Sequence, residues 1–510
     1  MGSGIFDKRR YGKRLEKNSS EFRDWMNPVV GCGRVGSERD RMGEAGVRSS
    51  VDGGTREAGA RYASILGAGT GRSFDDLIES GSASGVVTLV RADLNVPLER
   101  DRDNAEVVLG VADASRIEAA MCTVEKLSDA GARVVLVSHL GRPGGVQVPG
   151  LGMGPVAEVV GRLLAAGGRG ARWKGLVTGP GGCVGKEREA GVGSLRDGEV
   201  LMLENLRFHP GEEADDAGFA ADLARGCGLY VNDAFGCSHR SHASVTLRGV
   251  NWVRRVPGVL LTREVETLRP ILAEPRRPML TVVGGSKVKD KLGVLRAVLK
   301  VADTLCVGGR MAFAFLAAQG VHIGDDKVGD RGHVDLARDV LEEAGRRGVR
   351  VVLPVDVVCG VPEDAARGLV TGNVRQVCAG GGCGVGHANL ADPCVVTGDV
   401  GPQTLALYAE AVAEAQTVLW NGPVGIFEVD AFSEGTARVG ELIAQATERG
   451  AVTVVGGGDT GLALAQAGSK GRVGFVSTGG GATLEFITLF GQGKVLPGIA
   501  SLAFERCTQA

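Results

Sequence analysis

The chain has 510 residues, a formal net charge of −2, and a composition of 44% hydrophobic and 23% charged residues. This length exceeds what one hydrophobic core usually supports, so it predicts two or three domains. The near-neutral charge gives no electrostatic case for nucleic acid, and the longest apolar runs have the length of strands rather than of membrane spans. We therefore expect no nucleic-acid partner and no membrane partner.

Residues 1–71 mix Gly, Ser, Arg and Glu without a sustained helical or strand period. They are interpreted as a mostly disordered extension. Acidic residues throughout this segment argue against a transit peptide, which is poor in acids. The 11 cysteines lack the regular spacing of a small secreted scaffold and indicate a reducing compartment. We expect a cytoplasmic protein, with a plastid or another organelle as the alternative.

From Val86 onward, short β-prone runs alternate with helical patterns such as Arg116–Ala130. This alternation is typical of βαβ units and predicts an α/β fold with parallel sheets covered by helices on both faces. The predicted strands are Val86–Val90, Arg133–Val137, Val200–Leu203, Leu229–Val231, Met279–Val283, Thr304–Val307, Val349–Leu353, Thr417–Trp420, Val452–Val455 and Val473–Val476.

The alternation breaks at Val256–Leu272, where Pro-Gly precedes a single helix-like segment. We place a domain boundary there, which gives an N-terminal domain at 72–256, a hinge helix region at 257–272 and a C-terminal domain at 273–486. Two parallel-sheet domains would bind ligands at the carboxyl ends of their strands, facing a shared cleft.

The predicted strands of the first half end in cationic or imidazole residues. A lone arginine is usually a solvated surface residue, but the same chemistry at every strand end is harder to explain in that way. Guanidinium groups in such a ring suit a small substrate that carries several negative charges, such as carboxylate or phosphate. The segments are Arg91–Asn95, Ser138–Pro143, Glu204–His209 and Asn232–Arg240, with Arg116 at the start of the first crossover helix.

The strands of the second half end instead in glycine-rich turns, which offer backbone N–H groups to phosphates. The stretch Ala451–Thr460, AVTVVGGGDT, predicts a strand, a phosphate-sized turn and a helix at Gly461–Ala467. Asp459 beside a phosphate requires a cation between the two, so the stretch predicts a nucleotide together with Mg²⁺. Phosphoryl transfer between the two halves is the expected chemistry.

One rival function is that of an NAD-dependent dehydrogenase, because Gly456, Gly458 and Gly461 satisfy G-x-G-x-x-G after a strand. That function needs an acidic residue at the end of the next strand to hold a ribose. The strand Val473–Val476 is followed instead by Ser-Thr-Gly-Gly-Gly.

Several segments together resemble phosphoglycerate kinases, in the order and near the spacing of that family. The resemblance covers roughly Ser73–Leu502, and the matching segments are RADLNVPL, SHLGRP, LENLRFH, YVNDAFGCSHRSH, VVGGSKVKDK, VLWNGPVGIFE, VVGGGDT and STGGGATLEF. It implies two Rossmann-like domains joined by a helical hinge, with 487–510 returning toward the N-terminal domain, in a monomeric enzyme. It also implies Mg²⁺-dependent transfer between 1,3-bisphosphoglycerate with ADP and 3-phosphoglycerate with ATP, by hinge closure and without a general base, in glycolysis or in carbon fixation.

The resemblance assigns residues to two sites. It gives Arg116, Lys291, Gly457 and Gly480 catalytic roles and makes Asp459 the metal ligand. The triose-phosphate site falls on Asp93, Asn95, Arg116, His139, Arg142, Arg207, His239 and Arg240. The nucleotide site falls on Gly285, Ser286, Lys287, Lys291, Gly309, Asn421, Glu428, Gly457, Gly458, Asp459 and Thr460.

Two departures from the family pattern affect this interpretation. Arg310 stands where the family usually has a glycine, and its side chain is expected to crowd or reshape the adenine pocket. A catalytically silent nucleotide-binding member is therefore a second rival. A glycine-rich insertion brings Cys378, Cys383 and His387 together between Cys359 and Cys394. Free cysteines are expected there, and zinc binding or redox activity stays open because the spacing is not C-x₂-C.

Overall fold

The computed structural model describes residues 53–67, 73–101, 104, 107–179, 182–286, 288–321, 331–360, 375–378 and 396–503. Lys287, His387, Cys383 and Cys394 lie outside the described residues, as do the side chains of Cys359 and Cys378. Among the described residues, no helix is both long enough and apolar enough to cross a bilayer.

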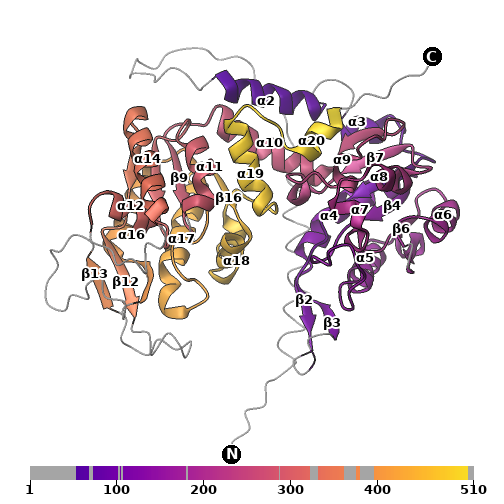
Figure 1. The fold of residues 1–510 in the computed structure, drawn as a ribbon, viewed down its shortest axis with the longest axis horizontal. Coiled ribbons are helices and arrows are strands. Elements are labelled where there is room, and N and C mark those ends of the chain that lie inside the picture. Colours follow the sequence, from indigo (N-terminus) through magenta and orange to yellow (C-terminus); the bar gives the residue numbers. More distant parts are fainter. Residues whose placement is uncertain are drawn as a thin grey trace, which may run out of the picture. The chain divides into compact units, whose positions relative to one another are not determined.

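The first sheet has six parallel strands in the order β5-β6-β4-β1-β7-β8. Among these strands, Figure 1 labels β4, β6 and β7. The central strand β1 pairs with β4 on one side and β7 on the other, so Leu89 lies between Val135 and Tyr230. The strands are β1 (Val87–Arg91), β4 (Arg133–Val137), β5 (Trp173–Leu176), β6 (Val200–Met202), β7 (Leu229–Asn232) and β8 (Arg254–Pro257). β5 and β8 were not among the strands that the sequence predicts.

Both faces of this sheet are buried, because successive side chains of a strand point to opposite faces. Val90, Leu136 and Met202 belong to one hydrophobic cluster, whereas Leu89, Val135 and Leu201 belong to another. The longer helices of this half are α3 (Phe74–Glu79), α4 (Ser115–Asp129), α5 (Gly154–Ala166), α6 (Lys186–Gly193) and α8 (Ala217–Ala224), and single helical turns form α7 (Pro210–Glu213) and α9 (Ala243–Thr246).

The second sheet also has six parallel strands, in the order β11-β10-β9-β15-β16-β17. In chain order this is 3-2-1-4-5-6, the order of the Rossmann fold. The strands are β9 (Met279–Val283), β10 (Thr304–Val307), β11 (Arg350–Val352), β15 (Thr417–Asn421), β16 (Val452–Gly456) and β17 (Phe475–Val476). The predicted α/β fold class is confirmed, with two parallel sheets and helices on both faces.

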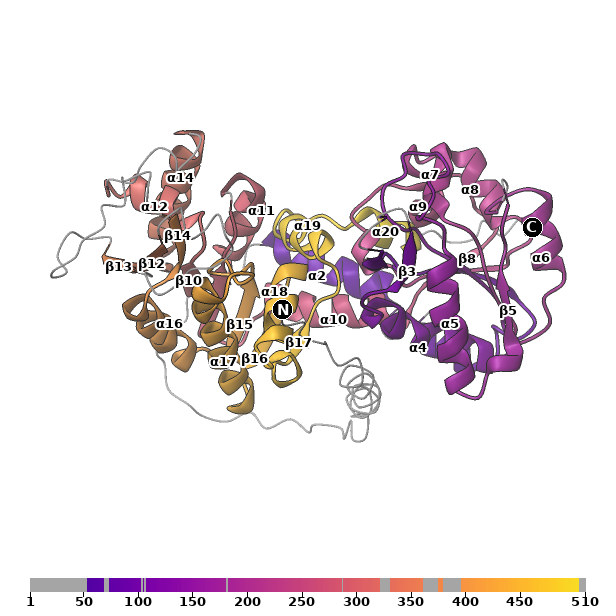
Figure 2. The same cartoon turned by 90° about the horizontal axis from the view of Figure 1, so that it is seen from below.

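Helices cover this sheet on both faces (Figure 2). Leu280 and Val282 pack in a cluster with α16 and α17, while Met279 and Val283 belong to the cluster that contains α11 and α19. The helices are α11 (Val288–Val298), α12 (Ala312–Ala318), α14 (Arg331–Arg347), α16 (Pro402–Glu414), α17 (Glu434–Glu448), α18 (Gly458–Gln466) and α19 (Gly481–Gly491).

Two small antiparallel sheets accompany the parallel ones. β2 (Leu98–Arg100) pairs with β3 (Val108–Val111), and β12 (Asp356–Gly360) pairs with both β13 (Arg375–Cys378) and β14 (Val396–Val400). The sequence predicted neither sheet, because their strands are short and are separated by glycine-rich or polar segments.

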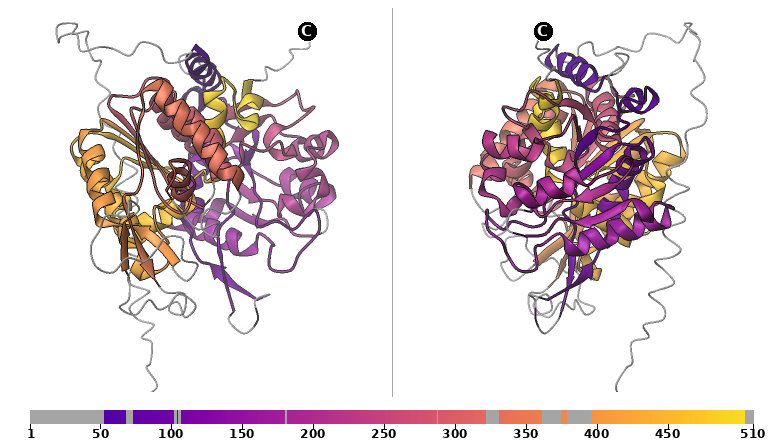
Figure 3. Two further views of the ribbon diagram at one scale, coloured as in Figure 1. Left: turned by 60° about the vertical axis from the view of Figure 1, so that its left-hand side comes forward. Right: turned by 90° about the vertical axis from the view of Figure 1, so that its right-hand side faces the viewer.

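A helix lies inside the segment that the sequence predicts to be mostly disordered. α2 (Gly53–Ile65) has Ala58 and Tyr62 fully buried. The Tyr62 hydroxyl accepts the Leu496 backbone N–H at 3.0 Å, and its ring lies 4.8 Å from that of Phe486. Figure 3 shows α2, in indigo, beside the yellow C-terminal helices. The prediction was wrong for 53–65. A short helix depends on tertiary packing for its stability, and the apolar side of α2 packs against residues more than 400 positions later in the chain.

The break between the two patterns contains α10 (Val259–Ala273). Gly258 precedes it, and the Asp233 carboxylate accepts the backbone N–H groups of Leu260 and Leu261 at 2.8 and 3.2 Å, which caps its first turn. The final segment contains α20 (Pro497–Ala500), where Gly498 O accepts the Asn232 side-chain amide at 3.0 Å. Gly498 also donates its backbone N–H to Ser238 O at 2.9 Å, so α20 contacts both the end of β7 and the loop that follows it.

Candidate active site

The carboxyl ends of the first sheet carry the predicted anion-binding residues. Asp93 and Asn95 follow β1, His139 and Arg142 follow β4, Arg207 follows β6, and His239 and Arg240 follow β7. Since these strands are parallel and β1 lies between β4 and β7, their ends meet at one edge of the sheet.

Arg116, in the first turn of α4, reaches back to the loop after β1. Its Nη1 lies 3.2 Å from Asp93 Oδ2 and donates to Asn95 O at 3.1 Å. The arginine side chain is 32% exposed, so part of the guanidinium remains open to a ligand. The contact with Asp93 fixes the Arg116 guanidinium at the site and leaves part of it accessible to a ligand.

The loop after β4 joins two of the other predicted residues. Gly141 N donates to Asn95 Oδ1 at 2.9 Å, and Gly141 O accepts from Arg207 Nη1 at 2.8 Å. Arg207 is 3% exposed, and its Nε lies 3.2 Å from Glu213 Oε1. Arg142, next in this loop, is exposed. Asn95 and Arg207 are therefore brought together through one glycine, while Arg142 lies at the solvent edge.

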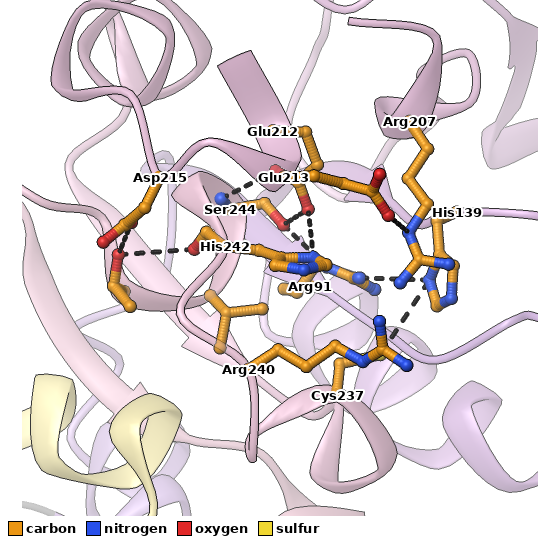
Figure 4. A network of polar contacts seen from close by, with 12 residues as sticks. Arg91, His139, Arg207, Glu212, Glu213, Asp215, Cys237, Arg240, His242 and Ser244 are labelled. Carbon is orange, nitrogen blue, oxygen red and sulfur yellow. Dashed lines mark hydrogen bonds and ion pairs between the residues drawn. The ribbon is translucent and has the colours of Figure 1, made fainter. Parts of the chain in front are cut away.

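The histidines at these strand ends are neutral donors or acceptors rather than cations. Burial, reinforced by neighbouring arginines, holds the pKa of His139 well below its ordinary value. Burial also lowers the pKa of His239, whose Nε2 accepts from Arg240 Nε at 3.2 Å. His242, which the sequence did not single out, has its pKa lowered to about 3, first by burial. The positive charge of the site therefore comes from its arginines (Figure 4).

Arg91 opens the first of the predicted cationic strand-end segments, although it was not among the residues assigned to the triose-phosphate site. It is fully buried at the end of β1, and its Nη2 lies 3.1 Å from His139 Nδ1. The signal that could have found it is a charge at the end of a strand whose other residues are apolar, because charged side chains are almost never fully buried without a partner.

Asp93, His139 and Cys237 place one ligand atom each within 4.8 Å of one another, which is a spacing that could hold a metal ion. His139 Nδ1, however, faces the Arg91 guanidinium at 3.1 Å, and Asp93 is paired with Arg116. A dication there would meet two fixed positive charges at short range, so the cluster is a poor site for a metal ion.

At the carboxyl ends of the second sheet, glycine-rich turns line a cavity of about 490 Å³. Close backbone approach requires glycine here: a Cβ on Gly309, which has φ +68°, would lie 2.7 Å from Gly285 N. The cavity is lined by Gly285, Ser286, Gly309, Arg310, Ala312, Phe313, Pro354, Val357, Thr397, Gly398, Asp399, Val400, Pro423, Val424, Gly425, Ile426, Glu428 and Asp459. Gly285, Ser286, Gly309, Glu428 and Asp459 are thus placed together as the sequence predicts.

Arg310 is exposed and forms part of the cavity wall. The cavity stays open with this side chain present, so the arginine shapes the pocket without filling it. Thr397–Val400 of β14 also line this cavity.

Lys291 and Asn421 form a pair beside this cavity. The Lys291 ammonium, on α11, donates to Asn421 Oδ1 at the end of β15, and Asn421 is 1% exposed. Burial lowers the pKa of Lys291 to about 8, and the negative charge of Asp459 acts in the opposite direction. A lysine with so little water around it gains more from a phosphate than a solvated lysine does.

α18 begins at Gly458 rather than at the predicted Gly461, so Asp459 and Thr460 lie in its first turn. Asp459 is exposed, whereas Thr460 is fully buried with its Oγ1 accepting from Gly422 N at 2.9 Å. Gly457, before the helix, and Gly480, before α19, have φ of +101° and +54°. Neither helix has a side-chain cap at its glycine N-cap, which favours phosphate at these turns.

Asp459 fits a magnesium ion. Mg²⁺ is usually held by one or two carboxylates together with phosphate oxygens and water. An exposed carboxylate on the wall of a glycine-lined cavity, in the first turn of a helix that favours anions, supplies that donor set.

The G-x-G-x-x-G match of Gly456, Gly458 and Gly461 follows β16, the fifth strand of its sheet. In a dinucleotide-binding fold this fingerprint follows the first strand, next to the point where the strand order reverses. That point lies between β9 and β15, so the match has no dinucleotide-binding context.

Comparison with known proteins gives a single result. A family model described as phosphoglycerate kinase matches residues 78–489. The phosphoglycerate kinase of Moorella thermoacetica is 44% identical over 415 residues, which are 81% of this chain and 95% of the relative. That of Chlorobaculum tepidum is 41% identical over 423 residues, which are 82% of this chain and 97% of the relative.

Solved structures agree with these sequence relatives. The phosphoglycerate kinase structure from Coxiella burnetii superposes with a TM-score of 0.66 at 32% identity, covering 82% of this chain and 96% of that one. The structure from Pyrococcus horikoshii gives a TM-score of 0.68 at 26% identity, covering 84% and 98%.

Proposed function

The chain belongs to the phosphoglycerate kinase family, and we propose that it catalyses reversible phosphoryl transfer between 1,3-bisphosphoglycerate with ADP and 3-phosphoglycerate with ATP. It is a phosphotransferase with a carboxyl group as acceptor. The observation that carries the proposal is the pairing, in one chain, of an arginine-lined set of strand ends with a glycine-lined cavity that contains Asp459.

This reaction does not require a side chain to remove a proton from the nucleophile. In the direction that consumes ATP the nucleophile is a carboxylate, which is already ionised at neutral pH. Catalysis then depends on holding donor and acceptor in line and on spreading charge over the oxygens of the transferring group. The neutral histidines of the site fit this demand, since none of them has to act as a base.

Different residues would position the reactants and stabilise the charge of the transferring group. Arg116 keeps the acceptor carboxylate or the transferring group in contact with a partly exposed guanidinium. Lys291 offers a weakly hydrated ammonium to the nucleotide phosphates. The turns at Gly457 and Gly480 supply backbone N–H groups from the starts of α18 and α19.

A magnesium ion held by Asp459 would neutralise the nucleotide phosphates and orient them. Asp459 would contribute the carboxylate, and the first turn of α18 would offer backbone N–H groups to the nucleotide phosphates.

Domain closure would complete the site. We place the hinge in the region of α10 and expect ligands on both halves to be required for closure, which also excludes water from the acyl phosphate. Small-angle scattering should show compaction only with both substrates present. Unchanged dimensions in the ternary mixture would contradict the hinge proposal.

A coupled assay with 3-phosphoglycerate and Mg·ATP tests the function directly. Turnover is expected, and its absence with retained nucleotide binding would favour the catalytically silent family member. Calorimetry separates the remaining rival, because an NAD-dependent dehydrogenase binds NAD and ignores Mg·ADP. The same chemistry serves glycolysis and carbon fixation, so the assay is run in both directions, and the expected monomer is checked by light scattering.

A further inference from the structure

A chain of buried polar contacts leads from Glu212 to His139 (Figure 4). Both oxygens of the fully buried Glu212 carboxylate accept from Ser244, Oε2 from the backbone N–H at 2.9 Å and Oε1 from the hydroxyl at 2.6 Å. Ser244 Oγ in turn accepts from Arg91 Nε at 2.9 Å, and Arg91 Nη2 reaches His139 Nδ1 at 3.1 Å.

The direction of the last contact is fixed by the chemistry of the two groups. A guanidinium has donors only, so His139 Nδ1 has to accept the hydrogen bond. An imidazole whose Nδ1 accepts is neutral and carries its proton on Nε2. A protonated His139 would place N–H against N–H at this contact.

The groups that surround His139 also favour the neutral form of its ring. The ring is 4% exposed, and burial together with the surrounding arginines holds its pKa well below the ordinary value. Cys237 Sγ lies 3.8 Å from the same Nδ1, and burial raises the pKa of that thiol to about 11, which leaves it protonated at neutral pH. The titratable and charged groups near the ring are Arg91, Asp93, Arg207, Cys237, Arg240 and His242.

The position of Arg91 depends on the other end of the chain. Its guanidinium is fully buried, with Nη1 on Ala92 O, Nε on Ser244 and Nη2 on His139. The Ser244 hydroxyl has one proton, which it donates to Glu212, so its lone pair is turned toward Arg91. Removing that hydroxyl leaves a buried guanidinium donor without its partner, and the orientation of the Arg91 guanidinium is then no longer fixed at Nε.

We propose that Glu212, Ser244 and Arg91 are positioning residues that hold His139 in the neutral Nε2–H tautomer, so that it offers a fixed N–H donor to a carboxylate or phosphate oxygen of the three-carbon substrate. The identity of that substrate rests on the proposed function. The orientation and protonation of His139 do not, because they are properties of the free protein.

The test begins with the ligand-free full-length chain, ¹⁵N-labelled on its seven histidines. Ring ¹⁵N–¹H correlation spectra, with His139 assigned by its absence in His139→Gln, should show the neutral Nε2–H tautomer from pH 5.5 to pH 8. An imidazolium or an Nδ1–H tautomer at His139 would overturn the proposal, whatever the activity of the protein.

Ser244→Ala tests the relay itself. The pure Nε2–H signal of His139 should be lost, and KM for 3-phosphoglycerate should rise about fivefold to tenfold, the size of one lost hydrogen bond, with kcat changing less. Ser128→Ala is the matched control, because it removes another buried hydroxyl and should leave both readouts unchanged. Ser128 donates to Gly198 O at 2.6 Å, and Gly198 precedes β6, at the amino end of the strand rather than at the carboxyl end that carries the site. Glu212→Gln should alter the His139 signal in the same direction as Ser244→Ala.

The outcomes separate the two proposals. An unchanged His139 signal and KM in Ser244→Ala refute the relay while leaving the kinase activity intact. A wild-type protein with the expected tautomer but without turnover of 3-phosphoglycerate refutes the proposed function, and with it the substrate named here.

Discussion

The buried carboxylate of Glu264 on α10 accepts two hydrogen bonds from Thr478, one from its backbone N–H at 2.7 Å and one from its hydroxyl at 2.8 Å. Thr478 precedes Gly480 and the start of α19, so this contact joins the helix at the break between the two halves to a turn of the proposed nucleotide site. Burial raises the pKa of Glu264 to about 7, although the hydrogen bonds from Thr478 and Ser477 oppose this.

This contact predicts a pH-dependent stability. Folded Glu264 keeps its proton up to pH about 7, whereas an unfolded glutamate loses it near 4.5, so its contribution to the free energy of unfolding falls as pH rises between those values. Glu264→Gln cannot titrate. We expect the free energy of unfolding of Glu264→Gln, minus that of wild type, to be roughly 1–3 kcal/mol larger at pH 8 than at pH 5. Urea unfolding at the two pH values measures this difference. An equal difference at both pH values would contradict the raised pKa.

Arg116 gives a prediction for catalysis. Arg116→Ala removes the partly exposed guanidinium that Asp93 and Asn95 hold at the strand ends, and we expect kcat to fall about 10³-fold, as for other charge contacts on a transferring phosphoryl group. Steady-state assays in the ATP-consuming direction measure this. Arg162→Ala, an exposed arginine on α5, serves as the control and should turn over normally.

The close backbone approach at Gly309 gives a prediction for nucleotide binding. Gly309→Ala places a methyl group 2.7 Å from Gly285 N, so the two turns have to separate and Mg·ADP should bind at least about tenfold more weakly, a loss of about 1.4 kcal/mol. Gly320→Ala is a matched control, because Gly320 also has positive φ, +87°, but open space around its Cβ. Calorimetry that finds equal affinity in the two variants would argue against the cavity as the nucleotide site.

Asp459 gives a prediction for metal dependence. Asp459→Asn removes the carboxylate proposed to hold Mg²⁺, so the Mg²⁺ concentration for half-maximal rate should rise roughly tenfold or more, by analogy with the loss of groups that support metal ligands. KM for 3-phosphoglycerate should stay as in wild type. Glu428→Gln, a second exposed carboxylate of the same cavity, should change nucleotide affinity without changing the Mg²⁺ requirement. If both variants respond alike to Mg²⁺, Asp459 is not the metal ligand.

Apart from β5 and β8, the parallel strands could be predicted from the sequence because strands buried on both faces are continuous apolar runs that end in glycine or polar residues. Met279–Val283 and Thr304–Val307 have the predicted bounds. The positions of Asp93, Asn95 and Arg207 could be predicted because residues that follow neighbouring parallel strands meet at one edge of the sheet.

The sequence by itself thus determined the fold class, the family and the two kinds of strand end, because periodicity and strand-end chemistry are local properties of the chain. Only the tertiary structure decided which partners the buried groups meet. It turned Arg91 inward onto Ser244 and His139, made the histidines of the site neutral, and stabilised the helix around Tyr62 against residues near the other end of the chain. Burial and pairing depend on contacts between distant residues, and no local pattern records them.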